Sequence, residues 1–235
     1  MQKKNLLEFF SMIMEAATSD IWVATLMQFM QQTSKELYIH SINVALISIH
    51  LTIFGNQEKI GIGLHSLILG ALLHDIGYVG TVRNINGKPR TDMTAIDKMV
   101  FEIHIHNGIE QVKHHTNDQG VLDIIAMHHE YVDGSGFPNG LKNEEVPPYV
   151  RIVSMANNLD NFIRLSNQNK MNTESILTTL ENAFQEESKK GRYDFTILND
   201  FSKNFSEYAS SLAPFLDALT QFHKQMSGND KKDLH

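Results

Sequence analysis

Apolar residues recur every three or four positions along most of this chain, and that spacing restricts the fold more than any other feature of the sequence. Residues with this period share one face of an α-helix, which can then pack against other helices. Clean alternation over six residues, which would indicate a strand, does not occur. The pattern therefore predicts an all-α fold. The expected helices lie at residues 6–14, 22–30, 42–49, 64–73, 150–163, 174–184 and 201–222.

Two polar segments that contain glycine and proline interrupt the helical pattern, at residues 80–94 and 131–148. We expect both to be ordered loops. No low-complexity tract or flexible linker divides the chain. We therefore predict one domain at residues 31–205, with a helical extension at residues 1–30 before it and a helix with a frayed polar tail at residues 206–235 after it.

The composition excludes several classes of function. Lys plus Arg is 20 and Asp plus Glu is 27, and a net charge of −7 argues against broad binding to a nucleic-acid polymer. The absence of cysteine excludes disulfides, cysteine-ligated zinc, iron–sulfur clusters and cysteine nucleophiles. No apolar run is long enough to predict a membrane span. Glu8 and Glu15 interrupt the first apolar stretch, so we interpret it as an amphipathic helix rather than a signal peptide and expect a cytoplasmic protein.

The chain has 12 histidines, and several of them stand with carboxylates in or beside apolar helices. Glu36 and His40 are four residues apart, which places them on one helix face. His74 and Asp75 follow the apolar stretch at residues 64–73. The other sites of this kind are His104, His106, His128, His129 and Asp160. A lone helical histidine is more often an ordinary hydrogen-bonded residue than a ligand, but ionisable groups beside strongly apolar sequence need a partner or a metal.

Imidazole and carboxylate groups without thiolate suit iron, manganese, cobalt or zinc, and one aspartate can bridge two such ions through its two oxygens. Two cations about 3.5–4 Å apart generate a bound hydroxide and stabilise both the attacking and the leaving oxygen of a phosphoester. The sequence has no HExxH motif, no phosphate-binding loop with Lys-Ser/Thr and no GxSxG motif. Metal-assisted hydrolysis is therefore the expected chemistry.

Three segments resemble the HD-GYP subgroup of the HD-domain phosphohydrolases: LLHDIG at 72–77, HHEYVDGSGFPNGLKNEEVP at 128–147 and RIVSMANNLD at 151–160. GRYDFTILNDF at 191–201 is similar to the closing element of that subgroup. The resemblance runs from Glu36 to Phe201, roughly 70% of the chain. It implies a compact helical bundle with ordered loops over two or three divalent metal ions, commonly iron or manganese. It also implies hydrolysis of the bacterial second messenger cyclic di-GMP.

The resemblance further implies roles for single residues. Asp75 matches the bridging, catalytic carboxylate, and Glu36 matches the residue associated with a third metal. The implied metal ligands are Glu36, His40, His74, Asp75, His104, His128, His129 and Asn157. The implied substrate-binding residues are Gly134, Gly136, Phe137 and Pro138 of the loop, together with Lys142 and Arg151; Lys88 and Arg164 are further candidate cations.

Three positions depart from the subgroup. Phe137 replaces the tyrosine of Gly-Tyr-Pro and loses its hydroxyl, and Tyr78 replaces the lysine that normally follows HDIG. Asn157 stands where the family has a metal-binding aspartate; its amide oxygen can ligate but carries no charge, so one metal position should be weakened. Asp160, three residues later on the same helix face, is a candidate substitute ligand. A basic Arg-Pro-Tyr-Arg run that follows in the family is also missing, since this chain reads FIRLSNQNK.

These features leave three functions open. The first is a phosphodiesterase that hydrolyses cyclic di-GMP or a related cyclic dinucleotide, with attack by a metal-bridging hydroxide. The second is a degenerate module that keeps its metals and serves as a sensor or a partner-docking domain. The third is a phosphohydrolase for another nucleotide. The expected ligand is a cyclic dinucleotide; a protein partner at the Gly-Phe-Pro loop and an oligomeric assembly stay open.

Overall fold

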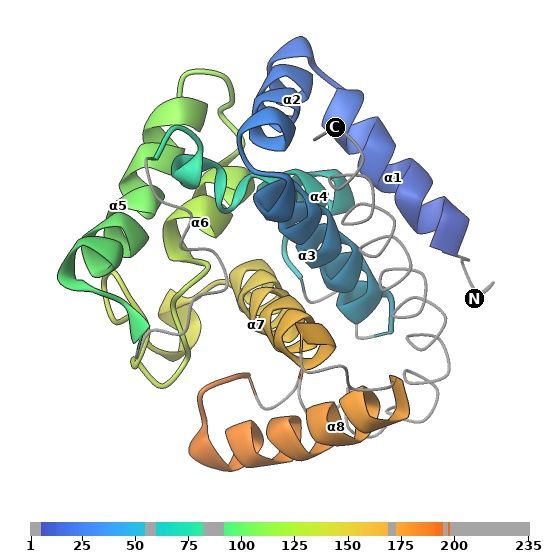
Figure 1. The fold of residues 1–235 in the computed structure, drawn as a ribbon, viewed down its shortest axis with the longest axis vertical. Helices are drawn as coiled ribbons and strands as arrows, with labels where there is room; N and C mark the ends of the chain where they lie inside the picture. The colour runs from blue at the N-terminus through green and yellow to red at the C-terminus, as the bar shows by residue number, and fades with distance from the viewer. Residues whose placement is uncertain (1–5, 55–59, 82–91, 169–172, 195–196, 198–235) are drawn as a thin grey trace, which may run out of the picture.

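A computed structural model of the chain describes residues 6–54, 60–81, 92–168, 173–194 and 197. All of its regular elements in these ranges are helical, so the predicted all-α fold is confirmed (Figure 1). The elements are α1 Leu6–Thr18, α2 Ile21–Thr33, α3 Lys35–Phe54, α4 Leu64–Leu73, η2 Ile76–Tyr78, α5 Ala95–Val112, α6 Gln119–Met127, η4 Asn143–Glu145, α7 Pro148–Gln168 and α8 Thr173–Lys190. The helix expected at 201–222 and the tail expected at 206–235 lie outside the described residues.

Helix α3 occupies the middle of the bundle (Figure 1). It packs against α2, α4 and α7, while α5 and α6 pack against each other and α6 packs against α4. The shared core is formed by fully buried aliphatic side chains, among them Leu46, Ile49, Leu67, Leu72, Ile124 and Val153. Burial of each such side chain stabilises the fold by about 1.5–3 kcal/mol.

The N-terminal helices share this core. Phe9 and Ile13 of α1 and Met27 of α2 are buried in the same cluster as residues of α3 and α4. The described part of the predicted N-terminal extension is therefore packed onto the domain that follows it. The boundary at residue 30 stays a prediction.

Helix α3 is also the described helix that is long and apolar enough to cross a membrane. Its segment Lys35–Ile53 has a mean hydropathy of 1.3, but 78% of that window is buried inside the protein. Packing against neighbouring helices therefore accounts for its apolar character, because a central helix is apolar on all sides.

Capping fixes where α5, which contains His104, and α6, whose C-cap is His128, begin. The Thr94 hydroxyl accepts a hydrogen bond from the Asp97 N–H at 3.2 Å, and the Asp97 carboxylate accepts one from the Thr94 N–H at 2.9 Å. This reciprocal pair is a capping box at the start of α5. Asp118 similarly accepts from the N–H groups of Gly120 and Val121 at the start of α6.

His50 makes the stability of this core sensitive to acid. Its imidazole is buried on α3, edge-on to the Phe9 ring of α1, and burial lowers the pKa of His50 from 6.5 to about 4. The unfolded chain takes up a proton near pH 6.5, whereas the folded chain takes it up only near pH 4. The stability that neutral His50 contributes is therefore present above pH 6.5 and is lost as the pH falls toward 4.

We expect His50→Leu to remove this loss. Between pH 7.5 and pH 5.0, metal-free wild-type protein should lose about 2 kcal/mol more of its free energy of unfolding than the variant. Urea denaturation at both pH values measures the difference. His106→Leu, at an exposed position on α5, is the matched control and should behave as wild type. Equal losses in wild type and His50→Leu would contradict the assignment.

Candidate metal centre

The ends of two helices bring the first ligand types together. Helix α4 ends at Leu73, so that His74 is its C-cap, and Asp75 directly precedes the short helix η2. His128 is the C-cap of α6 in the same way. The C-terminal end of a helix carries partial negative charge from its free carbonyl groups. Two such ends at one place favour a cation there.

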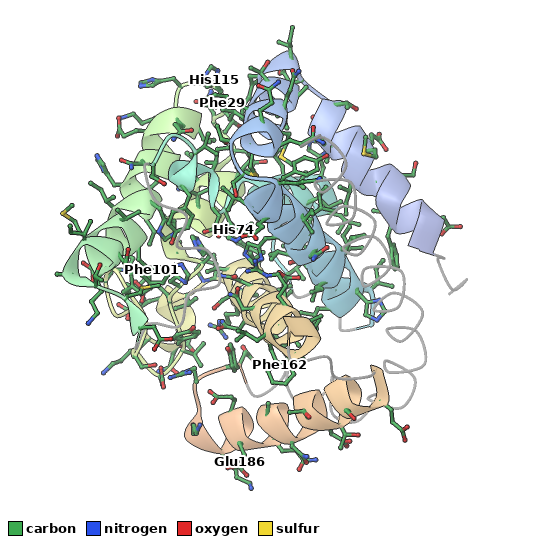
Figure 2. The ribbon with its side chains drawn as sticks, viewed as in Figure 1. Phe29, His74, Phe101, His115, Phe162 and Glu186 are labelled. Carbon is green, nitrogen blue, oxygen red and sulfur yellow. The ribbon has the colours of Figure 1, made fainter. Side chains whose placement is uncertain are left out.

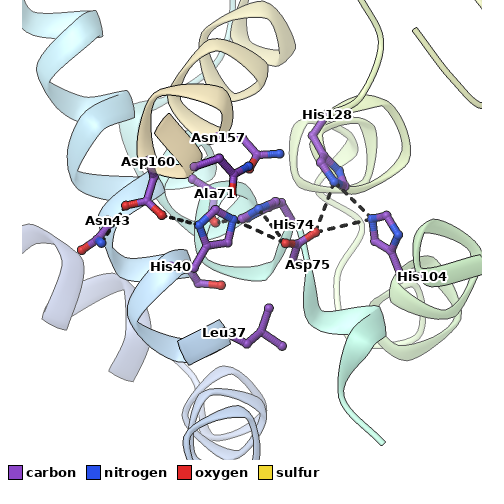
Figure 3. Close-up of polar contacts among 12 residues, drawn as sticks. Leu37, His40, Asn43, Ala71, His74, Asp75, His104, His128, Asn157 and Asp160 are labelled. Carbon is purple, nitrogen blue, oxygen red and sulfur yellow. Dashed lines mark hydrogen bonds and ion pairs between the residues drawn. The ribbon is translucent and has the colours of Figure 1, made fainter. Parts of the chain in front are cut away.

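Asp75 is the centre of the cluster (Figure 3). Its Oδ2 lies 3.5 Å from His40 Nε2 and 3.3 Å from His74 Nε2. Its Oδ1 lies 3.4 Å from His104 Nε2 and 3.3 Å from His128 Nε2. The Asp75 side chain is 5% exposed, and the four histidines are completely buried. Each carboxylate oxygen therefore faces two imidazole nitrogens, one pair on each side.

Hydrogen bonds on the far side of each ring determine which nitrogen faces Asp75 with a lone pair. His74 Nδ1 lies 2.8 Å from the Ala71 carbonyl oxygen, and His128 Nδ1 lies 3.1 Å from that of Ile125. Nδ1 of His104 bonds the Phe101 carbonyl oxygen in the same manner. A carbonyl can only accept, so the proton of each neutral ring is on Nδ1 and the lone pair is on Nε2.

The centre therefore collects acceptors without donors. Among the residues that the structure describes, the buried atoms His40 Nε2, His74 Nε2, His129 Nε2 and Asp75 Oδ1 find no hydrogen-bond partner. Buried polar atoms are normally paired, and a group of unpaired acceptors around one carboxylate fits a divalent cation. These nitrogen and oxygen ligand atoms thus fit the metal ions that the sequence implied.

The candidate metal ligands form two groups that share Asp75. Asp75, His104, His128 and His129 place one ligand atom each within 4.8 Å of one another, and so do His40, His74 and Asp75. The first group offers four ligands and the second offers three. Asp75 has one oxygen toward each group. Its role as a bridging ligand stays a prediction.

The protonation states suit metal binding. Burial raises the pKa of Asp75, but interactions with His74, His128 and His40 outweigh it and hold that pKa well below its usual range. Burial lowers the pKa of His104 to about 3 and also lowers the pKa values of His128 and His129. Metal-binding imidazoles must be neutral, and these are. For His40, burial and Arg164 act to lower the pKa, yet the carboxylates of Asp160 and Asp75 raise it overall, so a proton competes with metal at this ring.

Asp160 lies behind His40 instead of beside Asp75. One oxygen of Asp160 accepts the His40 Nδ1 proton at 2.6 Å, and the other accepts from Asn43 Nδ2 at 2.7 Å. A carboxylate in this position fixes the ring and the tautomer of a ligand histidine. The structure thus gives Asp160 an orienting contact with His40, which differs from the substitute-ligand role that the sequence suggested.

The two remaining predicted ligands lie outside the groups formed by histidine and carboxylate. Asn157 is buried on α7, and its Oδ1 accepts a hydrogen bond from Asn161 Nδ2 at 3.1 Å. Glu36 is exposed in the first turn of α3. Their roles as ligands stay predictions.

Aromatic rings cover two of the imidazoles. Tyr78 stacks on His104 with ring centroids 4.2 Å apart, and Phe137 stacks on His129 at 4.5 Å. Phe101 lies between them, 5.7 Å from His104, 5.0 Å from His129 and 5.1 Å from Phe137. Two of the residues that depart from the family pattern, Tyr78 and Phe137, therefore pack directly on ligand candidates.

Glu130 stands with His128 and His129 in the sequence, but no role was predicted for it. Its carboxylate is buried and accepts hydrogen bonds from the backbone N–H groups of Asn139 at 2.6 Å and Leu141 at 3.0 Å. It closes the loop that presents Phe137. The sequence feature that could have identified Glu130 is its position directly after His128 and His129 and before a glycine-rich loop. Gly136 allows the same closure, because a Cβ there would lie 2.5 Å from Glu130 Cα and 2.6 Å from the His129 carbonyl oxygen.

Of the predicted substrate cations, Lys142 lies on the loop and Arg151 lies in the first turn of α7, directly after it. The Lys142 side chain lies over Gly134, where an added Cβ would be 2.5 Å from Lys142 Cε. Arg151 donates to the carbonyl oxygens of Val146 and Asn143, both at 2.7 Å, and pairs with Asp194. Arg151 thus holds the loop in place. Pro138 is exposed beside Phe137, and Lys88 lies outside the described residues. Substrate binding by these residues stays a prediction.

A buried His-Asp pair stands at the end of an apolar helix, with histidines from other helices around it, which is the arrangement that the resemblance implied. The chain belongs to the HD domain family, whose model matches residues 28–197. The predicted family is therefore confirmed.

Known proteins similar to this chain act on cyclic dinucleotides according to their names. The 3'3'-cGAMP-specific phosphodiesterase 1 of Vibrio cholerae is 25% identical over 178 residues, covering 74% of this chain and 39% of that protein. The cyclic di-GMP phosphodiesterase of Thermotoga maritima is 34% identical over 95 residues, covering 40% of this chain and 26% of that protein. The chain thus spans well under half the length of these curated relatives.

Solved structures agree on the fold. An HDG"Y"P protein from Bdellovibrio bacteriovorus has a TM-score of 0.53 and 28% identity, and the likeness covers 71% of this chain and 51% of that chain. The HD domain of L. monocytogenes phosphodiesterase PgpH, in complex with cyclic-di-AMP, has a TM-score of 0.55 and covers 83% of this chain and 96% of that chain. At 16% identity, the second likeness is one of fold alone.

Gly77 makes a close contact on which the centre depends. A Cβ at Gly77 would lie 1.8 Å from the His104 carbonyl oxygen and 2.6 Å from the Gly108 nitrogen. Both are backbone atoms of α5, so Gly77→Ala must push that helix, and His104 with it, away from Asp75. We expect at least half of the bound Mn²⁺ to be lost and a destabilisation of about 1–3 kcal/mol.

Metal analysis after dialysis and urea denaturation check both expectations. Gly63→Ala is the control, since the nearest atom to its added Cβ is Ser66 Oγ at 4.0 Å and its φ of −68° suits any residue. Normal metal content in Gly77→Ala would show that the contact does not position His104.

Asn157→Asp restores a negative charge beside the three-ligand group. We expect it to raise metal content toward two equivalents per chain, because a carboxylate binds a divalent ion more strongly than an amide does. Metal analysis of anaerobically purified protein measures this. Asn158→Asp adds the same charge on α7, but its side chain contacts Tyr131 and the Ser154 carbonyl oxygen. Equal metal content in the two variants would refute a ligand role for position 157.

Proposed function

We propose that the chain is a metal-dependent phosphodiesterase that hydrolyses a cyclic dinucleotide, cyclic di-GMP or a related molecule. The observation that carries this proposal is the position of Asp75, whose two oxygens face separate groups of buried imidazole donors. Two divalent ions held by one bridging carboxylate are suited to hydrolysis of a phosphoester.

The residues that would hold the metals are the histidines and the aspartate of the two groups, His40, His74, Asp75, His104, His128 and His129. Bound divalent ions supply activation of water and neutralisation of phosphate charge. The chain itself supplies the fixed orientation of the ligands. Asp160 Oδ2 lies 2.6 Å from His40 Nδ1 and fixes the orientation of that ring. Phe137 of the loop stacks on His129 and shields the His129 ring.

The names of relatives support the substrate class. The Vibrio cholerae relative is named for 3'3'-cGAMP and the Thermotoga maritima relative for cyclic di-GMP. Both are cyclic dinucleotides with two phosphodiester groups. We extend this class to the present chain. The identity of the metal, iron or manganese, is part of the proposal.

A second candidate is a binding module that holds a cyclic dinucleotide without hydrolysing it. Two observations favour it. Asn157 brings no charge to the centre, and its Oδ1 is engaged by Asn161. Arg151, expected to contact substrate, is held by Asp194 and two loop carbonyls.

Product formation distinguishes the two candidates. Purified protein, with Mn²⁺ or Fe²⁺ added anaerobically, should convert cyclic di-GMP or 3'3'-cGAMP to a linear dinucleotide. Bis-p-nitrophenyl phosphate serves as a generic diester. We expect Asp75→Asn to lower the rate by about a hundredfold or more, because even outer contacts of a metal centre contribute 10- to 100-fold.

Asp20→Asn, in the exposed turn between α1 and α2, is the matched control and should keep the wild-type rate. Binding of a dinucleotide without any product would support the sensor module. The absence of both binding and product would refute both candidates.

A further inference from the structure

Arg164 places a guanidinium close behind one side of the metal centre. It lies on α7, four residues after Asp160, and its Nε is 2.9 Å from Asp160 Oδ2. Its side chain is 15% exposed. A second nitrogen of the guanidinium donates to Asn161 Oδ1 at 2.6 Å. The positive charge is therefore fixed between two side chains of its own helix.

Through these two contacts Arg164 is connected to two residues of α7 near the centre, directly to Asp160 and through Asn161 to Asn157. Asp160 Oδ2, which pairs with Arg164, also accepts the His40 Nδ1 proton at 2.6 Å. Asn161, which accepts from Arg164, donates to Asn157 Oδ1 at 3.1 Å. Both paths lead to the side of Asp75 that carries His40. Figure 3 shows Asp160, Asn157 and His40 on that side, with His104 and His128 on the other.

The charges on the His40 side are nearly balanced. Asp160 carries one negative charge, and the ion pair with Arg164 compensates it. Asn157 contributes a polar oxygen without charge. Asp75, the other carboxylate in contact with His40, keeps its negative charge, and its second oxygen faces His104 and His128. A metal ion on the His40 side therefore has three ligands, and the charge of Asp160 behind them is compensated, whereas the other side has four ligands.

We propose that Arg164 is a fixed internal cation that weakens metal binding at the His40–His74–Asp75 group. The two groups are then filled in order, with the first ion at Asp75, His104, His128 and His129. At the effective dielectric of about 20 that describes protein sites, one fixed charge this close behind a ligand changes the affinity for a divalent ion by about tenfold or more. This inference rests on the metal centre of the proposed function, and it concerns metal affinity alone.

Calorimetric titration of metal-free protein with Mn²⁺ tests the proposal. We expect wild type to bind a first equivalent at least about tenfold more tightly than a second. Arg164→Met should tighten the second equivalent by about tenfold and leave the first within about twofold. Arg164→Lys keeps the charge and should resemble wild type. Arg192→Met removes a charge that lies over the Tyr131 ring and controls for net charge.

A double variant separates charge from packing. Asp160→Asn combined with Arg164→Met has the same net charge as wild type, and its asparagine oxygen can still accept the His40 proton. We expect its second-equivalent affinity to return to the wild-type value. This variant also leaves no buried carboxylate unpaired, so it remains measurable if Arg164→Met fails to fold.

Three results would overturn the proposal: equal affinities for the two equivalents in wild type, no tightening of the second in Arg164→Met, or retained tightening in the double variant. Binding of no metal at all would refute both this proposal and the proposed function. Sequential binding without hydrolysis of any dinucleotide would refute the enzyme alone and leave the role of Arg164 standing.

Discussion

One buried carboxylate organises this protein. Asp75 is surrounded by imidazole nitrogens that come from α3, α4, α5 and α6, and it is the contact that those segments have in common. Its negative charge survives burial because the surrounding rings stabilise it. The apolar helix α4 and the backbone contact between Gly77 and His104 hold Asp75 at the point where these segments meet. The loops and α7 are arranged around that point.

The imidazoles are held in two different ways. The rings of His74, His104 and His128 each bond a backbone carbonyl three residues earlier, so their orientation is built into the local helical backbone. His40 lies inside α3 and uses the Asp160 carboxylate of α7 instead. The three local rings keep their direction wherever their helices form. The direction of His40 depends on how α3 and α7 pack.

The same distinction explains what the sequence could predict. Helical periodicity predicted ranges that overlap α1 to α4, α7 and α8, but it gave no bounds for α5 or α6. The apolar surroundings of His74–Asp75 and His128–His129 marked these pairs as buried groups that need partners. These are local properties of the chain. The position of Asp160 could not be predicted in this way, because its contact with His40 joins residues 120 positions apart and depends on which face of α7 meets α3. Arg151 was expected near substrate for its charge, but it pairs with Asp194 and donates to the carbonyl groups of Val146 and Asn143 in the segment before α7. Glu130 was overlooked because its partners are backbone N–H groups that only a folded loop supplies.

The stacking of Phe137 on His129 ties the outside of the molecule to its interior (Figure 2 shows the neighbouring Phe101 among the side chains of this region). Phe137 belongs to an irregular segment in which its neighbour Pro138 is exposed, while the Nε2 atom of His129 is buried among the candidate ligands around Asp75. A displacement of that segment would uncover the His129 imidazole. A rotation of the imidazole would in turn remove the surface on which Phe137 packs. The loop and the centre therefore share this ring contact, so a change in the position of one alters the packing of the other.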